Sequence, residues 1–374
     1  MAKPIKIAYI IDTIVTPSAG TEKQLLYLLN GLDYEKVQPY LICFYQSEWM
    51  KSQTFKFPVY FLNLRSLFST DFFKAYNYFK KLHSQEKFDI AQTFFRDGNI
   101  FGTIAAKLAK VKVIISSRRN IGYWHDKIQI NILKFLQKYT TYYLANSQAA
   151  VDMTMKIEGA SKDKFKIIYN GLDLDKFKSL PSSARETVRA EWKLTDSDIV
   201  VGTVANLRPV KRLDTVVESA KELIPMYKNL KFVFIGEGPD RDSLQDLIDR
   251  YEISEYFRLP GSSENIPSVL SAFDIALLPS SNESFSNSLI EYMASKLPII
   301  ATRVGGNSEA INHEVNGLLY DLEDTNGLTN SLKIILEHKE KAKALAEQAS
   351  KKAFEEYSIE KMISNHIDFY STII

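Results

Sequence analysis

The sequence predicts an α/β protein with two domains, each built on a doubly wound parallel sheet. Short apolar runs of strand length alternate with segments of helical periodicity, and this series occurs twice along the chain. A segment rich in proline and serine, Leu180-Pro181-Ser182-Ser183-Ala184, separates the two series and marks a linker. The composition, 374 residues of which 45% are hydrophobic and 25% charged, is that of a globular chain large enough for two cores. We therefore expect domains at 1–180 and 181–356, followed by a C-terminal segment at 357–374.

The first domain is expected to begin with a strand and then a helix. Gly20-Thr21-Glu22 opens that helix, with Thr21 as the candidate cap. The expected strands are 5–11, 40–45, 60–64, 90–94, 111–116 and 142–145, and the expected helices are 22–32, 72–82 and 100–108.

The second domain repeats the pattern. Ser286 or Asn287 caps a helix that runs to about Ser295, and Pro298 stops it before the next strand. The apolar residues of the tail from 359 to 374 recur at helical spacing. The expected strands are 199–204, 232–235, 275–278, 299–302 and 317–320, and a further helix is expected from about Asp214.

Cysteine usage and hydropathy indicate a cytoplasmic protein. Cys43 is the only cysteine, so no intrachain disulfide can form and a reducing compartment is expected. The first apolar run is too short to span a membrane and is not followed by a small-residue cleavage site. We therefore expect it to be a strand and not a signal peptide.

The charge is distributed unevenly along the chain. Residues 1–180 contain 26 Lys or Arg against 15 Asp or Glu, a net +11, whereas residues 181–374 contain 21 against 30, a net −9. This asymmetry suggests an anionic partner for the first domain, and the alternative is a scatter of solvated lysines. The basic residues are spread over many elements without a recognised motif, which argues against nucleic acid and favours an anionic membrane surface.

Two carboxylates flank the helix that follows the strand at 275–278. Glu283 lies in the loop at the carboxyl end of this strand, and Glu291 lies two turns into the helix. Ligands of open α/β sheets bind outside the carboxyl ends of strands, where a helix amino terminus attracts anions. Carboxylates at such a position suit sugar hydroxyl groups, which donate hydrogen bonds to them. The alternative is that both are solvated surface charges.

The stretch 279–306 resembles the donor-binding signature of glycosyltransferase family 4 (GT4), a family of retaining enzymes. In that signature two glutamates eight residues apart lie between a buried strand and a helix ended by proline. The resemblance implies that Glu283 contacts the transferred sugar and Glu291 the ribose of the nucleotide. The family usually has glycines around the phenylalanine that follows the first glutamate, whereas Ser284 and Ser286 flank Phe285 here.

The resemblance extends to the turn after the strand at 199–204. In the family this turn carries an arginine and a lysine that bind the diphosphate. Lys211 matches the lysine, and Asn206 occupies the usual arginine position. If the turn is extended, residues i and i+2 share a face, so that Arg208 can substitute for that arginine. The donor-binding residues implied by the resemblance are Gly20, Asn206, Arg208, Lys211, Gly236, Arg258, Leu259, Glu283, Ser284, Phe285, Ser286, Asn287, Leu289 and Glu291.

The acceptor side is less well defined by the sequence. Arg118 and Arg119 leave a strand together, and they would either hold a phosphate or carboxylate in forked hydrogen bonds or form a surface ion pair. His125 follows six residues after Arg119, and many relatives place a histidine after this strand near the reacting sugar. The alternative is that His125 packs internally or faces solvent.

The resemblance implies the GT-B fold, in which two Rossmann-like domains face each other across a cleft and the C-terminal helix returns to the first domain. It also implies retaining transfer of a hexose-type sugar from a nucleotide diphosphate sugar, most often a UDP-sugar, to a glycan or lipid-linked acceptor in cell-surface polysaccharide synthesis. We expect no metal or cofactor, because Arg208 and Lys211 offset the diphosphate charge and Asp196-Ser197-Asp198 reads as a turn. The alternatives are a nucleotide-sugar epimerase or phosphorylase, and a non-catalytic nucleotide-binding regulator.

The helix expected at 72–82 combines aromatic residues with lysines. An interfacial helix of this composition would dock the first domain peripherally on the inner face of the cytoplasmic membrane. The alternative is that the aromatic residues pack on the sheet. The residues concerned are Phe68, Phe72, Phe73, Tyr76, Lys74, Lys80 and Lys81.

Overall fold

The computed structural model describes residues 3–121, 127–324 and 326–374, and the chain forms two compact units. Unit 1 consists of Met1–Gly171 together with Ile359–Ile374, and unit 2 consists of Leu172–Ser358. Each unit contains one parallel sheet with helices on both faces, as the sequence predicts. The division after Gly171 comes earlier than the linker expected at 180–184, and that segment lies within unit 2.

The sheet of unit 1 has seven parallel strands in the order β3-β2-β1-β4-β5-β6-β7. The first strand is central, and Ile7 on it pairs with Pro39 on β2 and with Ile90 on β4. Strands β1 and β6 have the bounds that the sequence predicts. The strands are β1 (Ile5–Ile11), β2 (Val37–Cys43), β3 (Val59–Phe61), β4 (Ile90–Thr93), β5 (Val113–Arg118), β6 (Tyr142–Ala145) and β7 (Phe165–Ile167).

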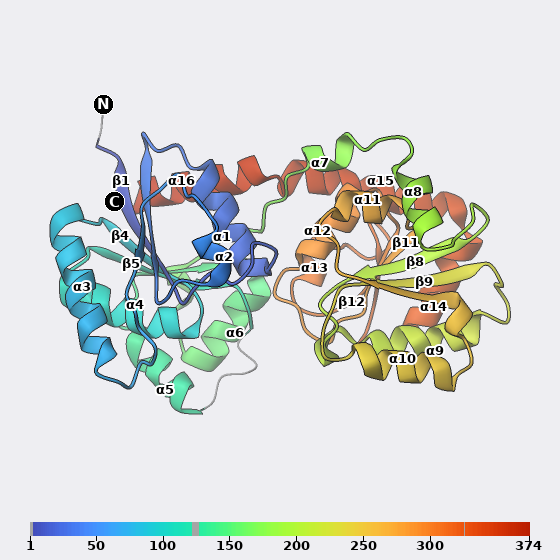
Figure 1. Ribbon diagram of the computed structural model, residues 1–374, viewed down its shortest axis with the longest axis horizontal. Helices are drawn as coiled ribbons and strands as arrows, with labels where there is room; N and C mark the ends of the chain where they lie inside the picture. The colour runs from blue at the N-terminus through green and yellow to red at the C-terminus, as the bar shows by residue number, and fades with distance from the viewer. Residues whose placement is uncertain (1–2, 122–126, 325) are drawn as a thin grey trace. The chain divides into compact units, whose positions relative to one another are not determined.

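Helices cover both faces of this sheet (Figure 1). One face packs against α1 (Gly20–Gly31) and α16 (Ile359–Ile373), and the other against α3 (Asp71–Glu86) and α4 (Arg96–Ala109). The remaining helices of unit 1 are α2 (Glu48–Lys51), α5 (Lys127–Leu136), α6 (Gln148–Glu158) and the 3-10 turn η1 (Lys162–Lys164).

Helix α16 is the C-terminal segment of unit 1 and packs beside α1 (Figure 1). The hydroxyl of Tyr370 on α16 donates a hydrogen bond of 2.6 Å to Oε1 of Gln92, and the hydroxyl of Tyr9 donates one of 3.3 Å to Tyr370. The expected cap of α1 is wrong. The N-cap residue is Ala19, and Thr21 lies inside the first turn.

The sheet of unit 2 has six parallel strands in the order β10-β9-β8-β11-β12-β13. Strands β8, β11 and β12 have the predicted bounds. The strands are β8 (Ile199–Val204), β9 (Leu230–Ile235), β10 (Phe257–Gly261), β11 (Ile275–Leu278), β12 (Ile299–Thr302) and β13 (Leu318–Tyr320).

The largest apolar cluster of unit 2 lies where α9 (Leu213–Leu223), α10 (Arg241–Arg250) and α14 (Gly327–Glu337) pack on the sheet. On the remaining surface, α12 (Asn287–Ala294) packs against α15 (Lys339–Glu356), and α8 (Ala184–Glu191) against α11 (Ile266–Ser271). The short elements are α7 (Asp175–Lys178), α13 (Asn307–Ala310), η2 (Pro209–Lys211) and η3 (Ser254–Tyr256). Within the described residues, no helix combines the length and hydropathy needed to cross a bilayer.

Candidate functional site

The candidate site of unit 2 lies where the strand order reverses. The chain adds β9 and β10 on one side of β8 and then continues with β11, β12 and β13 on the other side. The loops that follow β8 and β11 therefore leave the sheet from adjacent strands and diverge, which is the usual location of ligand sites in open α/β sheets. These two loops carry Lys211 and Glu283.

Lys211 and Glu283 form an ion pair across these two loops. The Nζ of Lys211 lies 2.5 Å from Oε1 of Glu283, and the Oγ of Ser280 donates a second hydrogen bond of 2.8 Å to the same oxygen. The side chains of Lys211 and Glu283 are 20% and 11% exposed, so both retain access to solvent. Two hydrogen-bond donors thus hold one carboxylate oxygen of Glu283 and fix the orientation of its carboxylate group.

Gly305 and Gly306 after β12 allow a close approach to the backbone of Glu283. Gly305 has a φ of +47°, and a Cβ built on it would lie 1.7 Å from the carbonyl oxygen of Glu283. The N–H of Gly306 donates a hydrogen bond of 3.1 Å to that same carbonyl oxygen. Any larger side chain at position 305 would displace the Glu283 loop.

Helix α12 brings Glu291 to the same edge of the sheet. Ser286 occupies the N-cap position of this helix, as expected, and Glu291 is 4% exposed. The hydroxyl of Tyr292 accepts a hydrogen bond of 2.7 Å from the N–H of Val204 at the end of β8. The hydroxyl of Ser288 donates a hydrogen bond of 2.8 Å to the carbonyl of Val204. These contacts fasten the helix that carries Glu291 to the strand that leads to Lys211.

The chain remains extended from the end of β8 to Arg208, before the 3-10 turn η2, as the substitution of Arg208 for the usual arginine requires. Leu207 is fully buried between the exposed residues Asn206 and Arg208, and Arg208 has φ −130° and ψ 154°. The N–H of Leu207 donates a hydrogen bond of 3.0 Å to the carbonyl of Glu237, which continues the pairing of β8 with β9. Asn206 and Arg208 therefore both project toward solvent near Lys211.

Several predicted donor-binding residues have structural contacts in unit 2. The guanidinium of Arg258 donates hydrogen bonds to the carbonyls of Trp192, Glu255 and Phe257, at 2.7–3.0 Å. The carbonyl of Leu259 accepts a hydrogen bond of 2.6 Å from Arg241. The side chain of Arg258 thus ties strand β10 to Trp192 and Glu255, and its guanidinium is occupied by backbone carbonyls.

The residues that follow Glu283 are largely buried. The ring of Phe285 lies 5.3 Å from that of Tyr357, and Leu289 is 1% exposed, so these two apolar side chains anchor the loop and the helix. Ser284 and Ser286 are 9% and 7% exposed. Gly236 has a φ of +137°, and its N–H donates a hydrogen bond of 2.8 Å to the carbonyl of Gly261.

The predicted acceptor-side residues Arg118 and Arg119 lie in unit 1, and each contacts a different side chain of that unit. Arg118 forms a buried bidentate ion pair with Glu158, with Nε–Oε1 and Nη2–Oε2 distances of 3.0 and 2.7 Å. Arg119 donates a hydrogen bond of 2.5 Å to Oδ1 of Asn170. Arg118 therefore forms an ion pair, but the pair is buried and not at the surface as the alternative supposed. His125 lies outside the described residues.

Gly20 and Asp12 lie in the part of unit 1 that follows β1. Gly20 is the first residue of α1. Burial, together with the nearby charge of Asp97, raises the pKa of Asp12 to about 7. Oδ1 of Asp12 is buried with no hydrogen-bond partner among the described residues. Asp12 is not among the predicted site residues, although it directly follows the carboxyl end of the interior strand β1, where ligand sites of open α/β sheets usually lie.

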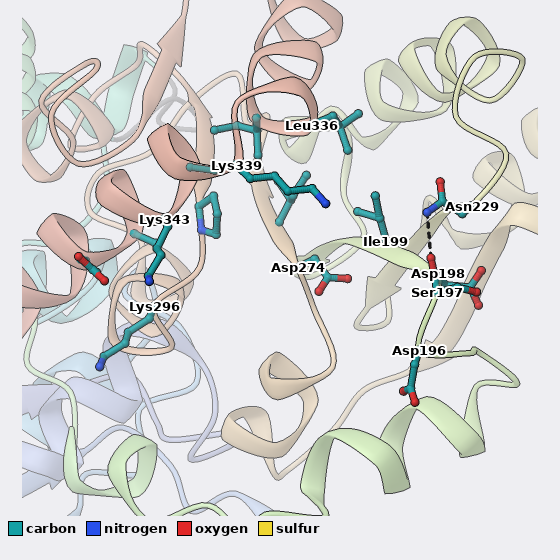
Figure 2. A pocket seen from close by; sticks show the side chains of 16 residues that line it. Asp196, Ser197, Asp198, Ile199, Asn229, Asp274, Lys296, Leu336, Lys339 and Lys343 are labelled. Carbon is teal, nitrogen blue, oxygen red and sulfur yellow. Dashed lines mark hydrogen bonds between the residues drawn. The ribbon is translucent and has the colours of Figure 1, made fainter.

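A hollow of about 760 Å³ lies at the opposite, amino-terminal edge of the unit 2 sheet (Figure 2). Lys296, Lys339 and Lys343 gather on one side of it, and Asp196 and Asp198 on the other. Asp196 and Ser197 form a turn, as predicted, and Oδ2 of Asp198 accepts a hydrogen bond from the backbone of Thr195. This turn lies apart from the strand ends that carry Lys211 and Glu283.

Two family descriptions match the chain. Glycosyltransferase Family 4 matches residues 18–176, and Glycosyl transferases group 1 matches residues 184–352. Together they cover most of both units, and the two Rossmann-like parallel sheets are those of the GT-B fold. The chain belongs to the GT4-type glycosyltransferases.

Individual relatives are distant in sequence. N-acetyl-alpha-D-glucosaminyl L-malate synthase of Bacillus anthracis is 26% identical over 65% of this chain and 63% of its own length. UDP-Gal:alpha-D-GlcNAc-diphosphoundecaprenol alpha-1,3-galactosyltransferase of Escherichia coli is 25% identical over 79% of this chain and 78% of its own. The crystal structure of Anabaena HepE in complex with UDP superimposes with a TM-score of 0.86 at 20% identity, over 99% of this chain and all of that chain, which shows the shared fold.

Proposed function

We propose that this protein transfers a hexose-type sugar from a nucleotide diphosphate sugar to a glycan or lipid-linked acceptor. The observation that carries the proposal is the Lys211–Glu283 pair at the strand-order reversal of unit 2, close to exposed Arg208 and to the helix that bears Glu291. This arrangement supplies cations for a diphosphate and carboxylates for sugar and ribose hydroxyl groups.

Each residue has a separate role in the proposed reaction. The bond between the anomeric carbon and the diphosphate oxygen breaks while the oxygen of an acceptor hydroxyl group bonds to the anomeric carbon, and the proton of that hydroxyl passes to the leaving diphosphate. Lys211 and Arg208 offset the negative charge that develops on the leaving diphosphate, which is the work a metal ion does in other transferases. Glu283 orients the sugar through its hydroxyl groups, since two donors already hold one of its oxygens. Glu291 binds the ribose.

We propose a UDP-sugar as donor and retention of the anomeric configuration. Support for the donor comes from two similar proteins: the name of the E. coli relative contains UDP-Gal, and HepE was crystallised with UDP. The name of the same E. coli relative also contains a diphosphoundecaprenol-linked acceptor, which supports a lipid-linked acceptor here and a role in cell-surface polysaccharide synthesis. Peripheral association with the inner face of the cytoplasmic membrane would present such an acceptor to the enzyme.

A panel of nucleotide sugars tested by thermal shift identifies the donor. A ligand present at 100 times its dissociation constant stabilises the protein by about 2.7 kcal/mol, which is a readily measured shift. We expect UDP-sugars to stabilise the protein, and no response to any nucleotide sugar would contradict the proposal.

Two further measurements separate the proposal from its alternatives. Product analysis with and without an acceptor distinguishes transfer from epimerisation, which needs no acceptor, and from phosphorolysis, which needs phosphate. Slow hydrolysis of the donor by the purified protein would exclude a purely regulatory role.

Turnover after exhaustive treatment with a chelator tests the proposed independence from metal ions, and we expect the rate of turnover to be unchanged.

A further inference from the structure

Helix α5 of unit 1 is apolar on two sides. Leu133 and Leu136 are buried against Ile100 of α4, which accounts for one side. On the other side Ile128 and Phe135, seven residues apart and therefore on one face, are 69% and 57% exposed. A helix of a globular unit normally presents polar residues to solvent, so this second apolar side requires an explanation.

The exposed side of α5 forms one wall of a groove of about 960 Å³, here called the α4–α5 groove. The other wall is the C-terminal half of α4, where Leu108 is 55% exposed. Figure 1 shows α4 between α3 and α5, on the sheet face opposite to α1 and α16. The apolar residues that line the groove are Ile104, Leu108, Ile128, Ile132, Phe135, Leu136 and Tyr139.

Lysines surround the groove. The Nζ of Lys138 lies 3.5 Å from the centre of the Phe135 ring, and that of Lys107 lies 5.5 Å from the centre of the Tyr139 ring. Lys110 lines the groove, and Lys127 and Lys134 are exposed on α5. Residues 98–125 and 127–151 contain no aspartate or glutamate. The groove therefore has an apolar floor and an almost purely cationic surround.

We propose that the α4–α5 groove is the surface through which unit 1 docks on an anionic lipid bilayer. An apolar floor between lysines matches the layered chemistry of a membrane interface, in which acyl chains lie below negatively charged head groups. A second copy of the chain is a poorer occupant, because a self-complementary contact would place the same lysines against one another.

The groove replaces α3 as the main docking element expected from the sequence. Phe72 of α3 packs against Phe101 with ring centres 5.3 Å apart, and Tyr76 is half-buried against the same core, so the alternative of packing on the sheet describes both. Phe68 and Phe73 remain exposed, at 85% and 69%.

This inference rests on the proposed lipid-linked acceptor, but its test does not depend on sugar transfer. The full-length protein is floated with liposomes of pure phosphatidylcholine and with liposomes containing phosphatidylglycerol, at 0.1 and 1 M salt. We expect flotation with the anionic liposomes at 0.1 M salt, and its loss at 1 M salt, where the Debye length falls from about 10 Å to about 3 Å.

Two variants address the groove itself. Ile128→Ser combined with Phe135→Ser removes apolar area without changing charge, and Lys134→Glu combined with Lys138→Glu reverses two charges. We expect the charge-reversal variant to weaken partitioning into anionic liposomes at least tenfold, because each basic residue near such a surface contributes about fivefold. We expect a loss of at least tenfold for the apolar variant as well, because interfacial binding scales with the apolar area that is buried in the bilayer. All four side chains are exposed, which preserves the fold, and an unchanged thermal melt verifies this.

Matched controls lie in unit 2 and on α3. Met226→Ser with Val315→Ser alters side chains that are 53% and 56% exposed in unit 2, and Lys228→Glu with Lys343→Glu reverses two exposed lysines there. We expect both controls to float like the unchanged protein. Phe73→Ser with Lys80→Glu tests α3 directly, and we expect it to weaken partitioning less than either groove variant.

Three results would overturn the inference: equal flotation with neutral and anionic liposomes, no flotation with either, or a loss that follows the α3 variant and spares the groove variants. UDP binding measured on the same protein samples tests the proposed function separately. Normal UDP binding without flotation would refute the docking surface alone, and flotation without any nucleotide-sugar binding would refute the proposed chemistry alone.

Discussion

Each of the two sheets has an ion pair near the carboxyl ends of its strands, and the two pairs differ in the number of contacts and in their exposure to solvent. In unit 1 the guanidinium of Arg118 meets Glu158 through two hydrogen bonds, and the two side chains are 8% and 4% exposed. In unit 2 Lys211 meets Glu283 through one contact, and the pair is more open to solvent. A planar guanidinium held at two points is fixed, whereas an ammonium group held at one point exchanges partners readily. The first pair therefore serves the fold, and the second is suited to receive a ligand.

Replacing Arg118 by alanine has the largest expected effect on stability. It leaves the buried carboxylate of Glu158 without its cation, which typically costs about 3–5 kcal/mol of unfolding free energy. Urea denaturation measures this loss. Arg119→Ala is the matched control. It removes a single hydrogen bond to Asn170, so we expect a loss of about 1 kcal/mol. A smaller loss for Arg118→Ala than for Arg119→Ala would contradict the structural role of the buried pair.

Replacing Lys211 by alanine should act on turnover and not on stability. Loss of one electrostatic contact to a developing charge costs about 3–4 kcal/mol in the transition state, or roughly 100- to 1000-fold in turnover. UDP-sugar turnover and urea denaturation of the same variant separate the two effects. Arg212→Ala is the control, since Arg212 is the adjacent cation and pairs with Asp214 at 3.5 Å. Turnover at the wild-type rate in Lys211→Ala would remove Lys211 from the mechanism.

Asp12→Asn should change the pH dependence of stability. Because burial raises the pKa of Asp12 to about 7, the folded protein binds a proton that the unfolded chain releases at lower pH. The stability of the unchanged protein therefore falls as pH rises from about 4 to about 7, and Asp12→Asn removes this fall. Relative to the unchanged protein, we expect the unfolding free energy of Asp12→Asn to be about 2–3 kcal/mol more favourable at pH 8 than at pH 5, as measured by urea denaturation. An equal effect at both pH values would show that Asp12 does not titrate in this range.

Ser280→Ala should have a smaller effect, confined to the orientation of Glu283. The hydroxyl of Ser280 donates one of the two hydrogen bonds to Oε1 of Glu283, and its loss is worth about 1 kcal/mol, or about fivefold in turnover. UDP binding should be unchanged. The neighbouring Ser281→Ala, which loses a contact of 3.2 Å to the carbonyl of Val210, is the control. Equal effects of the two variants on turnover would argue against a specific role for Ser280.

The sequence predicts the strands of this fold well because buried parallel strands are short, continuous apolar runs, and β1, β6, β8, β11 and β12 have the predicted bounds. Helix starts are less predictable. The cap of α1 is Ala19 because the backbone alone satisfies that turn, and no side chain contributes to it. The sequence also predicts correctly that Glu283 lies in the loop after β11 and that Glu291 lies in the helix that follows.

Contacts between distant segments are not visible in the sequence. Glu158 is 40 residues from Arg118, and nothing local indicates that the two meet. Ser280 and Tyr292 are ordinary residues until the folded chain places their hydroxyls beside Glu283 and Val204. The aromatic pattern of α3 likewise does not distinguish Phe72, which packs on the core, from Phe73, which is exposed. Burial by other elements decides each of these cases.

The separate roles of the two carboxylates are the central claim, and calorimetric titration of UDP into Glu283→Ala and Glu291→Ala tests it most directly. Glu291→Ala should weaken UDP binding at least tenfold, because a hydrogen bond to a charged group is worth about 1.5–3 kcal/mol. Glu283→Ala should bind UDP within about twofold of the unchanged protein, since UDP carries no transferred sugar. Glu291→Gln serves as the control, because it removes the charge but keeps the volume of this buried side chain. A loss of UDP affinity in this variant therefore does not come from misfolding. Equal losses of UDP affinity in the Glu283 and Glu291 variants would contradict the assignment.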